Sequence, residues 1–236
     1  MLFTLLGDLT NQATYMNKIK YLAAIVIAGF GLQQAKAFES DLTVGNSAIS
    51  GFAGPYGHVS ISLDVATQTA TVTFTSNTVN GNIYLFGDGG SVALNVNAAS
   101  FTVGTITGTN SLGGAFTPGP FSVSNNGAED GFGMFNLNIN SFDGFTHSSS
   151  TITFTLTNTS GVGWLTQADV VTLNSQGFDA AAHIFVTSVA NPTGALATGF
   201  AGEGPGTPAV PDGGATVMLL GAALGALGMV RRYLKR

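Results

Sequence analysis

Five segments in the middle of the chain alternate strictly between apolar and polar residues, and this period constrains the fold more than any other feature. A period of two puts Ile, Leu, Val and Phe side chains on one face and Thr, Ser and Asn on the other, as in a half-buried antiparallel strand. The Gly-, Asn- and Asp-rich stretches between the segments predict turns, because these residues accept positive φ. The sequence therefore predicts an all-β fold, an antiparallel β-sandwich of jelly-roll-like type. The alternating segments are 60–65, 71–75, 92–96, 135–140 and 151–157.

Residues 38–198 form the predicted sandwich domain, with two short helical decorations. Residues 166–169 and 178–183 are each expected to carry a helical turn, and a strand is expected through 184–186. From Asn191 the chain becomes rich in Pro, Gly, Ala and Thr, and residues 199–209 are expected to form a flexible spacer.

Basic residues lie only near the two ends of the chain. Between Phe38 and Pro211 there is no Lys or Arg, but there are ten carboxylates, which give the domain a charge of about −10 with neutral His. Such a domain has no permanent cation to neutralise phosphates, which argues against binding to nucleic acids or anionic lipid headgroups. The chain also has no cysteine, which excludes disulfides and thiolate chemistry.

The N-terminal part has the layout of a secretion signal, with Lys18 and Lys20, then the apolar run 21–32, then Ala35-Lys36-Ala37. A basic region, an apolar region and an A-x-A site in this order predict a signal peptide over 16–37, cut after Ala37 by signal peptidase. Residues 1–15 add nothing to this signal, and we expect translation to begin at Met16. A short buried helix or an N-terminal anchor is the alternative, but the run is too short to span a bilayer comfortably.

Residues 213–230 are an uncharged run of 18 residues that is rich in Leu, Ala and Gly. As a helix this run would measure about 27 Å, close to the roughly 30 Å hydrocarbon core of a bilayer. Arg231, Arg232, Lys235 and Arg236 follow it, and the positive-inside rule places them in the cytoplasm and the domain outside. The sequence therefore predicts a C-terminal transmembrane helix with a basic tail.

The segment Val210-Pro211-Asp212-Gly213-Gly214, followed by the apolar run and the basic cluster, resembles the VPDSG-CTERM sorting signal, a variant of the PEP-CTERM signals. Gly213 stands where the name of that signal has Ser. The resemblance covers residues 210–236. It implies recognition, and cleavage near residues 210–212, by an exosortase-type membrane enzyme of a Gram-negative bacterium that makes exopolysaccharide. A permanent membrane anchor is the alternative.

Residues 129–133, 142–147 and 180–186 also resemble a recurring domain of PEP-CTERM proteins. That family has no assigned activity. The resemblance therefore supports the prediction of export and leaves the chemistry of the domain open.

Glu129 and Asp130 are adjacent carboxylates in a Gly-rich stretch, where backbone carbonyls would complete the oxygen shell of a Ca²⁺ ion. Asp88 and Asp143, each beside Gly, are weaker candidates of the same kind. The role of turn and capping residues is favoured for all four, because the chain contains no EF-hand loop and no Ca-binding repeat. We therefore expect no cofactor, with Ca²⁺ as the alternative.

The three histidines, His58, His147 and His183, lie far apart and form no zinc-ligand pair. His147 is followed by Ser148, but no G-x-S-x-G elbow is present to complete a catalytic triad. A glycosidase needs two carboxylates across a cleft, and the sequence singles out no such pair. Trp164 is the one plausible sugar-stacking residue, although a core position is favoured for it. We therefore expect a non-enzymatic protein.

The expected function is that of an exported, exosortase-sorted protein of the cell surface or extracellular matrix, associated with exopolysaccharide. The helix at 213–230 would hold it as an inner-membrane intermediate before processing. One alternative is a carbohydrate-binding or carbohydrate-active module, which would bring two carboxylates to within roughly 5–10 Å of each other in a groove. Another alternative is a structural adhesin whose loops are stiffened by Ca²⁺.

Overall fold

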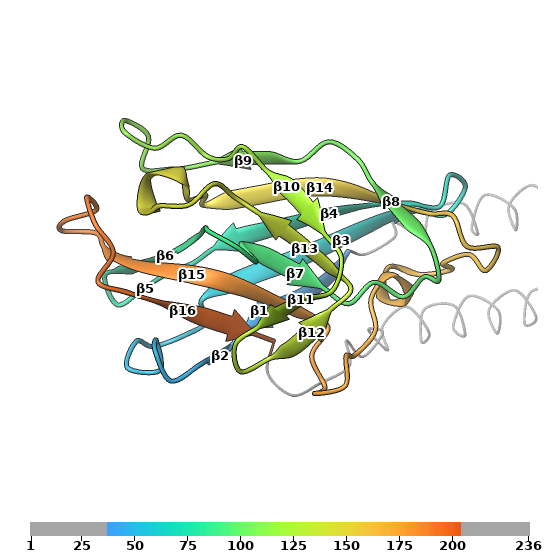
Figure 1. Ribbon diagram of the computed structural model, residues 1–236, viewed down its shortest axis with the longest axis horizontal. Helices are drawn as coiled ribbons and strands as arrows, with labels where there is room; N and C mark the ends of the chain where they lie inside the picture. Colours follow the sequence, from blue (N-terminus) through green and yellow to red (C-terminus); the bar gives the residue numbers. More distant parts are fainter. Residues whose placement is uncertain (1–36, 204–236) are drawn as a thin grey trace, which may run out of the picture. The chain divides into compact units, whose positions relative to one another are not determined.

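The computed structural model describes residues 37–203, and every strand pair in this part of the chain is antiparallel. The strands form two large sheets and one hairpin, and two 3-10 helices are the short helical elements (Figure 1). In chain order the elements are β1 Phe38–Leu42, β2 Val44–Gly45, β3 Gly57–Asp64, β4 Thr69–Ser76, β5 Thr78–Val79, β6 Asn82–Phe86, β7 Val92–Leu94, β8 Phe101–Val103, β9 Thr107–Thr109, β10 Ser122–Ser124, β11 Gly127–Glu129, β12 Gly133–Phe135, β13 Leu137–Asn140, η1 Phe145–His147, β14 Thr151–Asn158, η2 Gln167–Val170, β15 Ala180–Ser188 and β16 Ala197–Gly202.

Sheet A is six-stranded, in the order β1-β3-β4-β14-β8, with β9 also pairing with β14. Its long strands follow the predicted alternation, because each presents apolar side chains to the core and hydroxyl side chains to the outside. The register aligns these hydroxyls across the sheet, so that Ser60, Thr73 and Thr153 stand side by side.

Sheet B is eight-stranded, in the order β10-β13-β7-β15-β16-β2, with β6 pairing both β15 and β5. Its central strands are buried on both faces, since every residue of β7 is buried and no residue of β15 is exposed. The β11–β12 hairpin forms a separate two-stranded unit.

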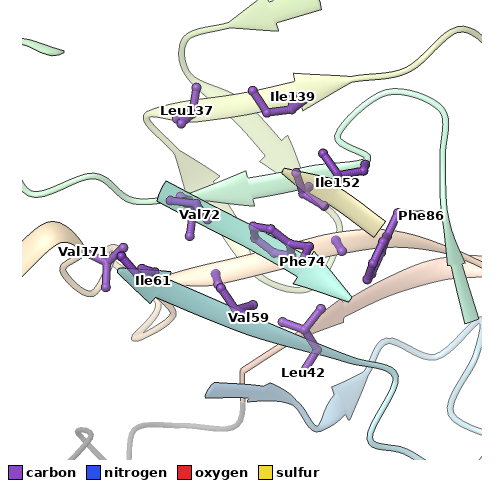
Figure 2. Close-up of a cluster of buried hydrophobic side chains, with 14 of the residues drawn as sticks. Leu42, Val59, Ile61, Val72, Phe74, Phe86, Leu137, Ile139, Ile152 and Val171 are labelled. Atoms are coloured by element: carbon purple, nitrogen blue, oxygen red, sulfur yellow. The ribbon is translucent and has the colours of Figure 1, made fainter. Parts of the chain in front are cut away.

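The main core lies between the two sheets and consists of the inward side chains of both (Figure 2). Phe74 of sheet A is fully buried, and its ring centroid lies 6.1 Å from that of Phe86 of sheet B. On the side of sheet A, Leu42, Val59 and Ile152 line the same cluster. The prediction of an all-β antiparallel sandwich is therefore confirmed.

Two smaller apolar clusters cover the outward face of sheet B. In the first, Ala93 and Ala181 pack with Phe132 and Phe135 of the β11–β12 region. In the second, Leu85 and Phe185 pack with partly buried apolar residues of later loops, namely Leu112, Phe116 and Phe145. Sheet B is thus the middle layer of the domain.

Two sequence predictions need correction. The turn predicted at 166–169 is present as η2, which begins with a capping box between Thr166 and Asp169, but residues 180–183 are the start of β15. Residues 199–202 are not a spacer, because β16 pairs with β15 and β2 through Gly202. Strand β15 is buried on both faces, so its sequence does not alternate between apolar and polar residues. Its run of Ala is also typical of a helix, and this is why a helical turn was expected there.

The predicted signal peptide before Ala37, the residues from 204 onward, and with them the predicted transmembrane helix and basic tail, lie outside the described residues. Between residues 37 and 203 no helix is long and apolar enough to cross a membrane.

Candidate functional site

The loop Gly87–Ser91 interrupts the sheet and carries the first of the predicted site residues, Asp88. Strands β6 and β7 flank this loop and both pair with β15, so the loop bulges out opposite His183. The Gly87 N–H donates to the His183 carbonyl over 3.3 Å, and the His183 N–H donates to the Gly90 carbonyl over 3.0 Å. Asp88 and Gly90 take positive φ values of 57° and 66°, the left-handed conformation that such a loop requires.

Asp88 contacts a second loop. Its Oδ1 accepts a hydrogen bond of 2.7 Å from the Gly144 N–H, which brings the segment 142–144 beside the Gly87–Ser91 loop. Asp143 lies in that segment and is exposed. The two candidates Asp88 and Asp143 are therefore neighbours, and Asp88 acts as a loop-to-loop tether.

Glu129 ends β11 and is only 2% exposed. Its carboxyl packs against Gly90, where a Cβ atom would overlap it. The Asn138 amide donates to Oε1, whereas Oε2 has no hydrogen-bond partner among the described residues. Burial raises the pKa of Glu129 to about 8, against the lowering effect of the Asn138 hydrogen bond. Glu129 is therefore largely protonated at neutral pH.

The Asn138 side chain joins Glu129 to the start of the same hairpin. Its Oδ1 accepts a hydrogen bond of 2.9 Å from the Gly127 N–H, while its amide group binds Glu129. Asn138 belongs to β13 and is itself 2% exposed. The Glu129–Asn138 contact thus fastens the β11–β12 hairpin onto sheet B.

Asp130 does not take part in the contact between Glu129 and Asn138. It is exposed, and its Oδ2 accepts a hydrogen bond of 3.0 Å from the Asn46 amide. Within residues 37–203, no three His, Cys, Asp or Glu side chains gather closely enough to hold a metal ion. Among these carboxylates, Asp88 thus contacts a neighbouring loop, Glu129 is buried against Asn138, and Asp130 lies on the surface beside Asn46.

The histidines are separate, each with its own partner. His58 Nδ1 lies 2.8 Å from Asp41 Oδ1 on sheet A. His147 Nδ1 lies 2.7 Å from the Gly119 carbonyl, so this ring is bound to the backbone and not to a serine. His183 stacks on Phe200 with ring centroids 4.4 Å apart, and burial lowers its pKa, which nearby Asp88 opposes.

Trp164 occupies the core position that was favoured for it. It is 2% exposed, and its Nε1–H donates to the Asn97 carbonyl over 2.7 Å. A groove of about 530 Å³ lies beside it, with exposed Val162 and Leu165 on its rim. Asp169 is the one carboxylate lining this groove, and its Oδ2 accepts hydrogen bonds from backbone N–H groups at the start of η2. Among residues 37–203 the groove is thus lined by one carboxylate, whereas the two-carboxylate mechanism of glycosidases uses a pair.

One pair of carboxyls was missed by sequence reasoning. Asp179 precedes β15 and Glu203 follows β16, and the pairing of these strands brings the two residues near each other, since the Glu203 N–H donates to the Ala180 carbonyl over 3.2 Å. Asp179 is 8% exposed. Burial and the contact with Glu203 raise its pKa. The sequence does contain a turn at Asn191–Gly194. Together with a strand at 199–202, this turn predicts the β15–β16 hairpin.

The predicted sorting and signal residues fall at or beyond the ends of the described region. Ala37 is partly exposed and lies directly before β1, whereas Ala35, residues 210–214 and the cluster of Arg231, Arg232, Lys235 and Arg236 lie outside the described residues.

The VPDSG-CTERM motif matches residues 209–234 of the chain. The resemblance predicted for this segment is therefore confirmed. The match indicates an exported protein that is sorted to the cell surface by an exosortase-type enzyme. No curated protein and no solved structure matches the chain.

Proposed function

We propose that this chain is a non-enzymatic protein of the cell surface or extracellular matrix, which an exosortase cuts near residues 210–212 and which associates with exopolysaccharide. The single observation that carries this proposal is the VPDSG-CTERM match at 209–234. A signal-peptide pattern at 16–37 supports it, because a sorting signal of this kind acts only on an exported chain.

The start of the folded domain agrees with the proposed route of export. Signal peptidase would cut after Ala37, and β1 begins at the next residue, Phe38. Phe38 is 9% exposed and lies opposite Ile61 in the sheet. Cleavage at this position would therefore remove the predicted signal and leave the whole sandwich intact.

The predicted helix at 213–230 would hold the exported chain in the inner membrane until processing. Its basic flank, beginning with Arg231 and Arg232, favours a cytoplasmic C-terminus by the positive-inside rule. The domain then faces the exosortase from the outer side of that membrane. Cleavage near Pro211 would separate the domain from its anchor.

The outward face of sheet A supports an association with polysaccharide. Its centre carries aligned hydroxyls of Ser and Thr, and its carboxylates lie on β1 and at the end of β3. Hydroxyls both donate and accept hydrogen bonds, as sugar hydroxyls do. Because residues 37–203 contain no Lys or Arg, a neutral polysaccharide suits this face better than an acidic one. The hydroxyl residues are Ser60, Ser62, Thr69, Thr71, Thr73, Thr75, Thr151, Thr153, Thr155 and Thr157.

The experiment that tests the proposal is mass spectrometry of the mature termini. The protein is expressed in its host with and without the exosortase, and cell-surface and inner-membrane fractions are compared. We expect an N-terminus at Phe38 in both strains, and a C-terminus near residues 210–212 only when the exosortase is present. An intact C-terminus on surface-exposed protein of the strain with exosortase would refute the processing step.

A further inference from the structure

Two neighbouring loops at one end of the sandwich hold aliphatic side chains out into the solvent (Figure 1). Val162 and Leu165 follow the end of β14 and are 83% and 77% exposed, more than any other large hydrophobic side chain of residues 37–203. Val65 follows the end of β3 and is 46% exposed. The ends of β3 and β14 lie on the same side because both strands pair antiparallel with β4. We call these three side chains the apolar tips.

Hydrogen bonds fix the backbone beneath the apolar tips. The Gln68 side-chain amide donates to the Val65 carbonyl over 2.8 Å and to the Trp164 carbonyl over 3.0 Å, which joins the two loops. The Trp164 N–H donates to Gln68 Oε1 over 2.6 Å, and the Leu165 N–H donates to Asp169 Oδ2 over 3.1 Å. The fold therefore holds the loops in place while it leaves the aliphatic side chains in water.

The surface beside the apolar tips is also largely apolar. The groove of about 530 Å³ next to Val162 and Leu165 is lined as well by Ala98 and Ala99, from the loop that follows β7. Single exposed apolar side chains are ordinary on a protein surface, but several of them beside an apolar groove mark an interaction site. This end of the domain is therefore a candidate docking surface.

The chain leaves the described domain at the same end. Glu203 is the last described residue, and its N–H donates to the carbonyl of Ala180, at the start of β15, over 3.2 Å. Ala180 lies opposite Leu94, the last residue of β7. Three residues later, the Asn97 carbonyl accepts a hydrogen bond of 2.7 Å from Trp164 Nε1–H, directly beneath the apolar tips.

The chain beyond Glu203 keeps this end of the domain close to the membrane. Only residues 204–212 separate Glu203 from the apolar run 213–230, which the proposed function treats as the membrane anchor. A segment of this length spans at most about 30 Å when fully extended. Such a short tether gives the domain an effective concentration of about 1 mM at the membrane surface, so that even a weak contact would form.

We propose that the apolar tips insert into the outer lipid surface of the membrane in which the helix predicted at 213–230 is anchored. This inference rests on the proposed function, which supplies the anchor. Val and Leu side chains gain free energy when they leave water for the apolar boundary of a bilayer. A zwitterionic lipid surface suits this end, because the charged groups beside the tips, Asp64 and Asp169, are both acidic and residues 37–203 contain no Lys or Arg.

The proposed contact would belong to the membrane-anchored form of the protein. Cleavage near residues 210–212 would remove the tether, and the apolar tips alone would then hold the domain only weakly. The same end would thus orient the domain on the membrane before processing and allow its release afterwards.

Fluorescence quenching by lipid tests the proposal on the full-length chain. Because the chain contains no cysteine, a fluorophore can be attached at one introduced position, Val162→Cys. The labelled protein is reconstituted in phosphatidylcholine vesicles with and without brominated lipid, and flotation separates vesicle-bound from free protein. We expect brominated lipid to quench the label at position 162. A label at Leu196→Cys is the matched control and should not be quenched, because Leu196 is 59% exposed at the opposite end of the sandwich, just before β16.

A second substitution measures how much the tips contribute. Leu165→Asp should lower the ratio of inserted to free tips, read from the quenching at position 162, by about tenfold, because it removes a Leu side chain from the contact. Leu196→Asp should leave this quenching unchanged. Both positions are exposed, so both variants should fold.

Three results would overturn the proposal. In the first, the protein floats with the vesicles but the label at position 162 is not quenched, which leaves the membrane anchor of the proposed function intact. In the second, the protein does not float, and the predicted anchor fails together with the inference. In the third, neither brominated lipid nor aqueous iodide quenches the label at position 162, so that a second copy of the chain covers the apolar tips in place of lipid.

Discussion

The two sheets of the sandwich differ in what covers their outward faces. Sheet A presents aligned hydroxyls and exposed carboxylates, and no apolar cluster of residues 37–203 lies over this face. Sheet B is overlaid by Phe132 and Phe135 on one part and by Phe116 and Phe145 on another. The carboxyls with raised pKa values, those of Glu129 and Asp179, both belong to the surroundings of sheet B. Among the described residues, the carboxyls with the large upward pKa shifts thus lie beside the covered sheet.

The largest effect that the comparison predicts concerns Leu85, on the outward face of sheet B. Leu85 is fully buried and lies opposite Phe185 in the sheet. Leu85→Ala should lower the free energy of unfolding by about 2–5 kcal/mol, because a cavity forms beneath the covering loops. Urea denaturation of the wild type and the variant measures this loss. A cost below about 1 kcal/mol would mean that the cover is loosely packed and that sheet B resembles sheet A.

The same difference explains which strands could be predicted from the sequence. Strands β3, β4 and β14 alternate visibly, because water faces one side of sheet A and the core faces the other. Strand β15 has apolar residues on both faces, so the sequence of its first residues also fits a helical turn, and residues 199–202 of β16 have the composition of a spacer. Whether a sheet face is covered depends on tertiary contacts, which the periodicity of a single segment does not predict.

The candidate site was only partly predictable for the same reason. The adjacent carboxylates drew attention to Glu129 and Asp130, but their opposite environments depend on the hairpin that folds Glu129 onto Asn138. The alternation of residues 135–140 predicted an outward Asn138, and this side chain does point out of the core, into a contact that the hairpin buries. The pair of Asp179 and Glu203 required the β15–β16 register, which the sequence reading lacked.

A smaller effect is expected from Glu129, through pH. Its pKa is about 8 in the folded chain and near the ordinary 4.5 when unfolded, so the folded state binds more protons between these values. The stability from this group is complete below about pH 4.5 and is lost as pH rises through about 8. Between pH 6 and 7 this loss should approach about 1.4 kcal/mol. Glu129→Gln should remove it and should be the more stable form at pH 8.

Urea denaturation at pH 6, 7 and 8 gives the slope of stability against pH for Glu129→Gln and the wild type. Asp179 contributes in the same direction, so the informative quantity is the difference between these slopes. Glu39→Gln, which changes an exposed carboxylate of sheet A, is the matched control and should keep the wild-type slope. Parallel slopes for Glu129→Gln and the wild type would show that water reaches Glu129 beneath the hairpin.

The smallest effect is expected on the uncovered face of sheet A. Thr71 is exposed on β4 and lies between Ser62 and Thr155, so Thr71→Ala removes a hydroxyl that water already solvates. The free energy of unfolding should change by no more than about 0.5 kcal/mol, against the several kcal/mol expected at Leu85. If this face binds exopolysaccharide, Thr71→Ala should instead weaken co-sedimentation of the protein with it. A loss of stability comparable to that of Leu85→Ala would show that sheet A is covered as well, and the contrast between the two sheets would then disappear.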